Sequence, residues 1–92
     1  MGFGRIGRNV ARMALGFGMM VLAYDPGLQS DVIRFTGVEP VESLMEGLCR
    51  ADIISLHAPR CGEIPLIGAC QFSAMKPSSF IVNTARGGLI DE

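Results

Sequence analysis

The chain has 92 residues, which is enough for one small domain with a thin core. Hydrophobic residues make up 49% of it and charged residues only 18%, a composition that excludes an intrinsically disordered chain. The net charge of −1 provides no basic surface, so we do not expect nucleic acid as a partner.

The cysteines and the hydropathy of the sequence indicate the cellular compartment in which we expect the protein. The three cysteines form an odd set without a CxxC pair, and the single histidine stands at no metal-ligand spacing from them: Cys49, Cys61 and Cys70. We therefore expect reduced thiols, no metal site and a cytoplasmic protein. The apolar stretch 13–24 follows three arginines, as in a signal peptide, but Gly16 and Gly18 interrupt it and it is too short to span a bilayer. We expect a soluble protein without a membrane partner.

The first two predicted elements are a helix and a strand. Between Arg5 and Leu15 apolar residues recur at helical spacing, which predicts an amphipathic helix. Gly16 and Gly18 are typical of the turn that ends such a helix. Residues 19–24 then form a continuous apolar run, as expected of a buried strand.

The remaining elements continue the alternation. We predict a polar helix over 29–34, a short strand within 37–41, a helix over 42–49, a buried strand over 51–56, a short helix over 70–76 and a strand over 80–83. Alternating helices and strands, with strands apolar on both faces, predict a parallel sheet covered by helices. The fold class is therefore α/β, as part of a doubly wound Rossmann domain.

Residues 2–7, Gly-Phe-Gly-Arg-Ile-Gly, match the G-x-G-x-x-G pattern of dinucleotide-binding turns. In that pattern Gly2 permits the tight turn, Gly4 lets the backbone approach a pyrophosphate, and Gly7 lets the helix pack closely. The helix that follows offers the amides of Arg5 and Ile6 to an anionic phosphate. A glycine-rich turn without a ligand is the alternative reading.

Asp25 stands at the end of the strand predicted after this helix. A carboxylate there can accept hydrogen bonds from both ribose hydroxyls of a dinucleotide and would repel a 2′-phosphate. Pro26 and Gly27 supply no arginine for such a phosphate, so the sequence favours NAD over NADP. A solvated turn aspartate is the alternative reading.

The segment 83–88, Asn-Thr-Ala-Arg-Gly-Gly, directly follows the last predicted strand. This places Arg86 at the carboxyl edge of the sheet, where open α/β sheets bind ligands. A guanidinium there can hold a substrate carboxylate in a bidentate fork and polarise an adjacent carbonyl. An ordinary surface arginine is the alternative reading.

Five ordered stretches together resemble the D-isomer-specific 2-hydroxyacid dehydrogenases, a family that includes phosphoglycerate dehydrogenases, hydroxypyruvate reductases and related corepressors. The stretches are residues 2–8, 24–26, 55–59, 75–77 and 83–92. The resemblance covers nearly the whole chain and implies an NAD-dependent oxidoreductase that transfers a hydride to or from a D-2-hydroxy acid. The loop 60–65 departs from the family pattern.

The resemblance also implies roles for single residues. Arg86 is the expected catalytic residue, and the expected cofactor-binding residues are Gly2, Gly4, Arg5, Ile6, Gly7, Asp25, Ala58, Pro59, Thr84, Ala85 and Arg86. His57 does not match the catalytic histidine of the family, which lies further along the chain in family members together with its glutamate. The expected partners of the intact protein are a small 2-hydroxy or 2-keto acid and a second copy of itself.

We expect residues 1–92 to be a partial NAD-binding domain without a second domain. A glycine-rich phosphate turn normally follows directly after a strand. We therefore expect that the first strand and the C-terminal elements of the domain are missing. We also expect that this chain alone is inactive. A dinucleotide-sensing module of the corepressor type, without enzymatic activity, is the second hypothesis.

Overall fold

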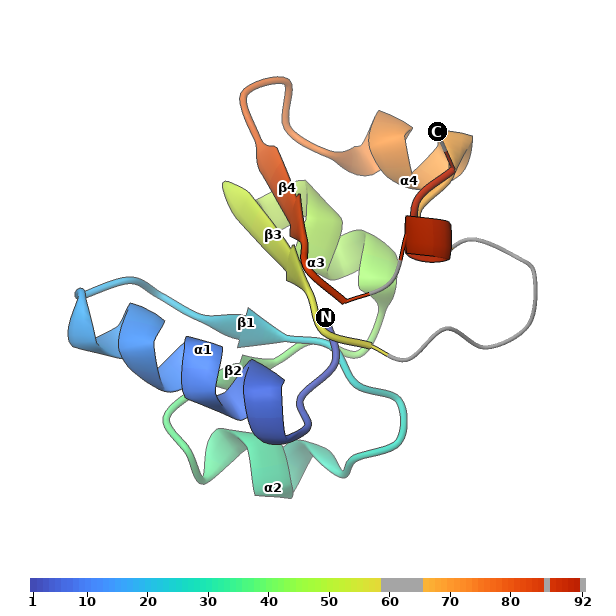
Figure 1. The fold of residues 1–92 in the computed structure, drawn as a ribbon. Coiled ribbons are helices and arrows are strands. Elements are labelled where there is room, and N and C mark those ends of the chain that lie inside the picture. The colour runs from blue at the N-terminus through green and yellow to red at the C-terminus, as the bar shows by residue number, and fades with distance from the viewer. Residues whose placement is uncertain (59–65, 86, 92) are drawn as a thin grey trace.

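The computed structural model describes residues 1–58, 66–85, 87–91, and has the predicted α/β class with parallel strands. Helices and strands alternate along the chain in the predicted order (Figure 1). The elements are α1 (Arg5–Gly16), β1 (Leu22–Ala23), α2 (Ser30–Arg34), β2 (Glu39–Pro40), α3 (Leu44–Arg50), β3 (Ile53–Leu56), α4 (Ala69–Ala74), β4 (Phe80–Asn83) and a 3₁₀ turn at Gly87–Leu89.

The strands form two parallel pairs. β1 pairs with β2, with Leu22 opposite Glu39, and β3 pairs with β4, with Ile53 opposite Phe80. No strand in the described part of the chain joins the two pairs. The N-terminal residues lie between them instead, as Figure 1 shows by the position of the N label.

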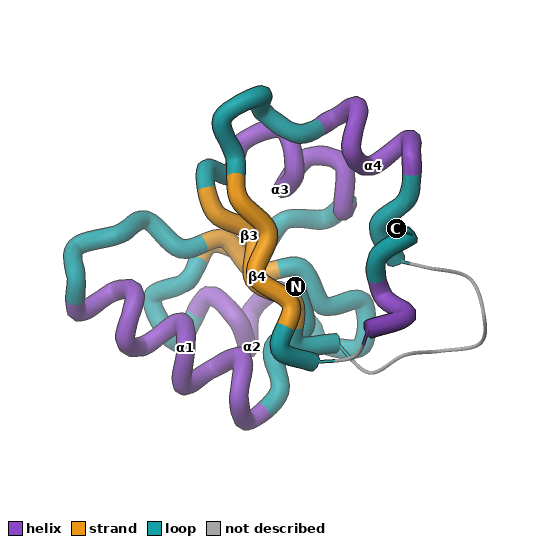
Figure 2. Tube along the Cα trace, turned by 45° about the horizontal axis from the view of Figure 1, so that its top comes forward, coloured by secondary structure: helices purple, strands orange, loops and turns teal. Residues whose placement is uncertain are grey.

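Each strand pair has a hydrophobic cluster of its own. The N-terminal cluster packs α1 and α2 against β1 and β2, and its buried members are Phe3, Ala11, Ala23, Ile33 and Val38. The C-terminal cluster packs α3 and the chain ahead of α4 against β3, and its buried members are Leu48, Ile54, Leu56, Ile67 and Leu89. Figure 2 shows the strands in the middle of the molecule with helices on either side. We call the two parts the N-terminal half, residues 3–41, and the C-terminal half, residues 44–91.

Local sequence explains where the longer helices begin and end. α1 begins after Gly4 and ends at Gly16, and Gly18 follows with φ of +82°, a backbone conformation that glycine adopts without strain. α3 begins after Ser43, whose Oγ accepts a hydrogen bond from the amide of Glu46 at 3.0 Å. Of these two helices, α1 contributes Ala11 to the N-terminal cluster and α3 contributes Leu48 to the C-terminal cluster.

The strand predicted over 19–24 is shorter than expected. β1 covers only Leu22–Ala23, and the side chains of Met19 and Met20 are 44% and 81% exposed. Apolar character was therefore not sufficient to make these residues a buried strand. Only β2 pairs with β1 along its length, and β2 itself begins at Glu39.

The prediction that the strands are apolar and buried on both faces is wrong for β3 and β4. Ile53, Phe80 and Val82 remain 51%, 70% and 45% exposed, whereas Ile54 and Leu56 are buried. Successive side chains of a strand point to opposite faces, so one face of this pair packs on α3 and the other lies open.

No helix within the described residues combines the length and the apolar character that crossing a lipid bilayer requires.

Candidate cofactor site

The glycine turn at residues 2–7 lies where the two halves meet. Gly2 has φ of +86°, and a Cβ built on it would lie 2.7 Å from the backbone nitrogen of Ala58. A Cβ on Gly7 would overlap the carbonyl oxygen of Gly2, so α1 packs directly on the turn. Apart from Gly4 and its two chain neighbours, no described residue has a heavy atom within 4 Å of the position that a Cβ on Gly4 would take. Gly2 therefore allows the tight turn, Gly4 leaves the backbone open to approach, and Gly7 allows the close contact of α1 with the turn.

The first turn of α1 leaves its amides free for an anion. Gly4 is the N-cap residue and provides no side-chain hydrogen bond, and the first turn contains no acidic residue. In a helix of 12 residues the N-terminal amides and the helix dipole attract negative charge. The amides of Arg5 and Ile6 belong to this turn, and the side chain of Ile6 is 66% exposed, so solvent reaches the site.

The carboxylate of Asp25 lies against the same turn. Its Oδ2 accepts a hydrogen bond from the amide of Phe3 at 2.8 Å, and its Oδ1 accepts one from the amide of Gly27 at 2.9 Å. Each carboxylate oxygen can accept a further bond. Asp25 thus ties the end of β1 to the glycine turn and still offers acceptors to a hydroxyl-bearing ligand beside Gly4.

The carboxyl ends of β3 and β4 face this turn from the other half. Ala58 touches Gly2, as the distance above implies. Thr84 and Ala85 follow Asn83, which pairs with Leu56, and the amide of Ala85 donates to Oδ1 of Asn83 at 3.2 Å. The parallel register brings these residues to the same edge of the sheet as the turn. Pro59 and Arg86 lie outside the described residues, so their predicted roles remain predictions.

Three residues that support the turn were not singled out by the sequence. Nε of Arg8 donates to the carbonyl oxygen of Phe3 at 3.1 Å, and its guanidinium carbon lies 5.6 Å from the centre of the Phe3 ring. Phe3 is buried, so this residue between two glycines anchors the turn in the N-terminal cluster. Its apolar character within a glycine turn was the signal that could have identified it.

The third residue is Ser55, whose Oγ lies 2.7 Å from Nε2 of His57. His57 follows β3 and donates its amide to the carbonyl oxygen of Met1 at 2.7 Å. Partial burial lowers the pKa of His57, and the nearby N-terminal ammonium lowers it further. The imidazole is therefore held neutral over a wider pH range than a free histidine.

These features fit a dinucleotide. The open space at Gly4 and the free amides of the first turn suit a pyrophosphate, and the Asp25 carboxylate beside them suits a ribose. Within the described residues no group of three or more histidine, cysteine or acidic side chains could hold a metal ion.

Comparison with known proteins supports this interpretation. Residues 1–92 match the family model described as "D-isomer specific 2-hydroxyacid dehydrogenase, NAD binding domain". The D-3-phosphoglycerate dehydrogenase of Methanocaldococcus jannaschii is 46% identical over 92 residues, which are 99% of this chain and 18% of that protein. The (S)-sulfolactate dehydrogenase of Chromohalobacter salexigens is 45% identical, over 99% of this chain and 30% of that protein. The chain thus spans less than a third of either relative.

Solved structures agree in fold. A D-lactate dehydrogenase from Salmonella superposes with a TM-score of 0.89 at 41% identity, over 98% of this chain and 27% of that one. The chain belongs to the family of D-isomer specific 2-hydroxyacid dehydrogenases and corresponds to their NAD-binding domain.

Proposed function

We propose that the protein carrying this domain is an NAD-dependent dehydrogenase that interconverts a D-2-hydroxy acid and the corresponding 2-keto acid. The observation that supports this most directly is the Asp25 carboxylate on the glycine turn, next to the open space at Gly4. Bound NAD would accept a hydride from the carbon that bears the hydroxyl group, or NADH would return one. The residues of this chain bind and orient the two reactants.

In this proposal the cofactor lies along the carboxyl edge of the sheet. The glycine turn and the amides of Arg5 and Ile6 hold the pyrophosphate, and Asp25 accepts the ribose hydroxyls. The nicotinamide end lies toward the loops after β3 and β4. The residues proposed to line that end are Ala58, Pro59, Thr84, Ala85 and Arg86.

Arg86 is the proposed substrate-orienting residue. Its planar guanidinium would bind the substrate carboxylate through two parallel hydrogen bonds and bring positive charge to the neighbouring oxygen. Because arginine stays protonated in proteins, another group has to exchange the proton that accompanies hydride transfer.

Asp25 is the residue that tests the cofactor assignment. Asp25→Asn keeps an oxygen that can accept the Phe3 amide but removes the charge that repels a 2′-phosphate. We expect the unaltered protein to bind NADH well over NADPH and the variant to narrow that preference, as measured by fluorescence titration with both cofactors. Asp31→Asn is the matched control, since the Asp31 side chain is exposed on α2. Equal affinity of the unaltered protein for the two cofactors would contradict the assignment.

Arg86→Lys tests the catalytic assignment, because it keeps the charge and removes the planar fork. We expect turnover of the active enzyme to fall by at least about tenfold, in line with a loss of ~1.4 kcal/mol of transition-state binding, while NADH affinity changes little. Arg12→Lys is the control on the exposed side of α1, where the Arg12 guanidinium donates to Oδ1 of Asn9 at 3.1 Å. Unchanged turnover in Arg86→Lys would show that the guanidinium of Arg86 does not orient the substrate.

We further propose that the intact protein acts in the cytoplasm as a homodimer. Cys49 and Cys70 are free and exposed, which suits a reducing compartment. Phe17 and Phe35 are 86% and 94% exposed, and a dimer interface that included them would remove their apolar rings from water. Sedimentation analysis of the full-length protein would distinguish a dimer from a monomer.

A further inference from the structure

Two side chains hold the two peptide groups that flank Phe3 in the glycine turn. The amide of Phe3 donates to Oδ2 of Asp25 at 2.8 Å, and the carbonyl oxygen of Phe3 accepts from Nε of Arg8 at 3.1 Å. The guanidinium carbon of Arg8 also lies 5.6 Å from the centre of the buried Phe3 ring. The peptide group before Phe3 is therefore held from the end of β1, and the peptide group after it is held from α1.

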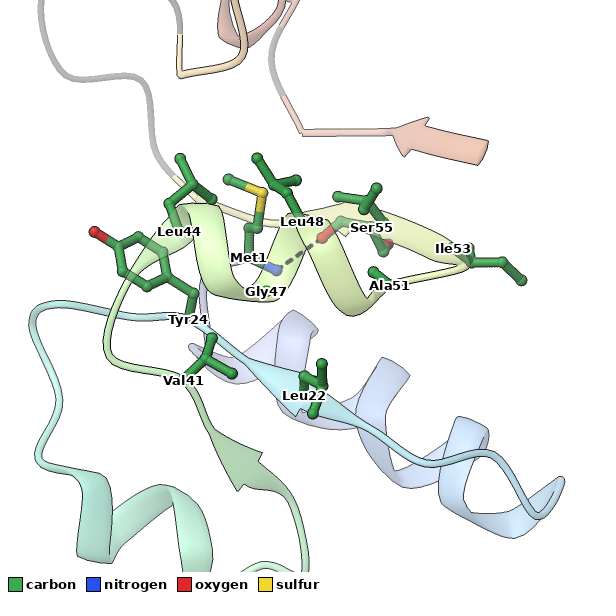
Figure 3. A pocket seen from close by; sticks show the side chains of 11 residues that line it. Met1, Leu22, Tyr24, Val41, Leu44, Gly47, Leu48, Ala51, Ile53 and Ser55 are labelled. Atoms are coloured by element: carbon green, nitrogen blue, oxygen red, sulfur yellow. Dashed lines mark hydrogen bonds between the residues drawn. The ribbon is translucent and has the colours of Figure 1, made fainter. Parts of the chain in front are cut away.

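The Asp25 side of the turn has further support. The amide of Gly27 donates to Oδ1 of Asp25, and the amide of Gly2 donates to the carbonyl oxygen of Tyr24 at 2.9 Å. Figure 3 shows Tyr24 and Met1 among the side chains that line a cavity of about 60 Å³ against α3. Several contacts thus fix the end of β1 on this side of the turn.

The Phe3–Gly4 peptide group depends on Arg8 to a greater degree. Within the described residues only Arg8 donates to the Phe3 carbonyl, and the amide of Gly4 has no hydrogen-bond partner. Rotation of this peptide group by half a turn would change φ of Gly4 from −79° to a positive value, which glycine adopts without strain. Without the bond from Arg8, the residue that opens the turn to a ligand would also let the peptide group flip.

The orientation of this peptide group decides which partial charge an anion meets. The peptide bond is trans, so the carbonyl of Phe3 and the N–H of Gly4 point in opposite directions. The carbonyl points to Arg8, so the N–H points away from Arg8, and Gly4 itself is exposed. After a flip, the negative end of the carbonyl dipole would lie where the amide hydrogen lies now, and it would repel a phosphate.

We propose, on the cofactor placement given above, that Arg8 is a positioning residue for the pyrophosphate. It acts through the Phe3–Gly4 peptide group, which it holds with the Gly4 amide toward the phosphate oxygens and the Phe3 carbonyl turned away. The position of the guanidinium over the Phe3 ring helps to direct Nε at the carbonyl. Because Arg8 acts through a hydrogen bond to the backbone, its Nε–H group matters more than its charge.

Three substitutions of Arg8 separate the donor from the charge. The side-chain nitrogen of glutamine lies as many bonds from the backbone as Nε of arginine, so Arg8→Gln keeps a donor there and loses the charge. Arg8→Lys keeps the charge but has a methylene group at that point. Arg8→Met has a similar length and packs well on an aromatic ring, but it has neither donor nor charge. Arg12→Met is the matched control, because it removes an exposed charge from the same helix.

Titration with NADH and with adenosine provides the first measurement. Adenosine has the ribose hydroxyls that Asp25 would accept, but it has no phosphate. We expect Arg8→Met and Arg8→Lys to lower NADH affinity at least about tenfold, as loss of a hydrogen bond to a charged group does, and to leave adenosine affinity unchanged. Arg8→Gln and Arg12→Met should bind both ligands nearly as the unaltered protein does.

Carbonyl chemical shifts provide a second measurement, which needs no ligand. The chain contains two Phe–Gly pairs, at 3–4 and 17–18, so ¹³C on phenylalanine carbonyls and ¹⁵N on glycine give two peptide signals. The signal of the first pair should move upfield in Arg8→Met and Arg8→Lys, which lose the donor, and should stay in place in Arg8→Gln. The second pair is the internal reference, since the amide of Gly18 donates to Leu15 at the other end of α1.

The possible outcomes separate a positioning role from other roles of Arg8. Equal NADH affinity of Arg8→Met and the unaltered protein would overturn the proposal. Loss of affinity in Arg8→Gln with retention in Arg8→Lys would also overturn it, because the effect would then come from charge alone. An equal fall in adenosine affinity, or movement of the 17–18 signal, would show a general structural role and overturn it as well. An unaltered protein that bound neither NADH nor adenosine would instead contradict the cofactor placement.

Discussion

The C-terminal strand pair is twice as long as the N-terminal one, although β1 lies within an apolar run of the sequence, as β3 does. β3 and β4 pair over four residues each, whereas β1 and β2 pair over two. β3 has β4 on one side and Met1 on the other, and Leu56 beneath it is completely buried. Just after β1, the amide of Gly2 donates to the carbonyl oxygen of Tyr24, and no described strand pairs with β1 on that side. The length of a parallel strand in this molecule is therefore set by its neighbours more than by its own residues.

The candidate site belongs to neither half alone. Asp25 and the turn it holds come from the N-terminal half, while Ala58, Thr84 and Ala85 come from the C-terminal half. Gly2 touches both. We call the place where Gly2 meets Ala58 the junction. Substitutions within one half and substitutions at the junction should consequently differ in their effects on stability.

A change within the C-terminal cluster should have the largest effect on stability. Leu56→Ala removes a fully buried side chain from β3 and should cost about 2–5 kcal/mol of unfolding free energy. Phe80→Ala on the neighbouring strand is the control, because that ring is 70% exposed and its loss should cost much less. Denaturant unfolding measures both. Because the two clusters are separate, the amides of β3 and α3 in Leu56→Ala should lose their protection from hydrogen exchange before the amides of α1 do. Equal loss of protection in both halves would contradict the existence of two distinct clusters.

A change at the junction should have the next largest effect. Gly2→Ala and Gly18→Ala both place a Cβ on a residue with φ above +80°, so both carry the same backbone strain. Only Gly2 has the backbone of His57 and Ala58 in the way, whereas Gly18 has open space. We expect Gly2→Ala to cost about 1–3 kcal/mol more than Gly18→Ala, the usual penalty of overpacking. Equal thermal midpoints for the two variants would mean that Gly2 and Ala58 are not in contact.

A change of pH should have the smallest effect, and it acts at the same junction. The pKa of His57 lies below its ordinary value of 6.5 in the folded chain, so between the two values the unfolded chain binds more protons. Stability should therefore rise as pH increases through this window and level off above 6.5. Burial likewise lowers the pKa of the Met1 ammonium from 8.0, which predicts a second rise that ends near pH 8.

His57→Gln separates the two steps of this pH profile. The variant should lose the lower rise and keep the upper one, as measured by the thermal midpoint between pH 5 and 9. A flat profile in the unaltered chain would show that neither group is protected from solvent at the junction.

The sequence predicted the elements whose signals are local. α1 and β4 were found almost to the residue, because helical periodicity and a short apolar run between turn residues depend on neighbours in the chain. The roles of the three glycines followed from their spacing, and the geometry around Gly2, Gly4 and Gly7 agrees with it.

The features that sequence reasoning missed depend on contacts between distant residues. Among the described residues β1 pairs with β2 alone, and the ring of Phe80 is 70% exposed. Both features depend on which elements lie beside a strand, and that cannot be read from the strand's own residues. Asp25 was predicted as a ribose ligand, but its bond to the amide of Phe3, 22 residues away, could not be read from either residue. The same holds for the contact of Ala58 with Gly2.

The position of Gly2 between two separate clusters has a consequence for the thermodynamics of ligand binding. A dinucleotide that contacts the glycine turn and the loops after β3 and β4 would bind both halves at once and only when they are docked. Its binding free energy then adds to the docking equilibrium, by about 2.7 kcal/mol when the free ligand is at 100 times its dissociation constant. By the same linkage, any substitution that loosens the junction lowers dinucleotide affinity without touching the ligand. A dinucleotide bound to both halves would therefore couple its own occupancy to the cooperative folding of the chain.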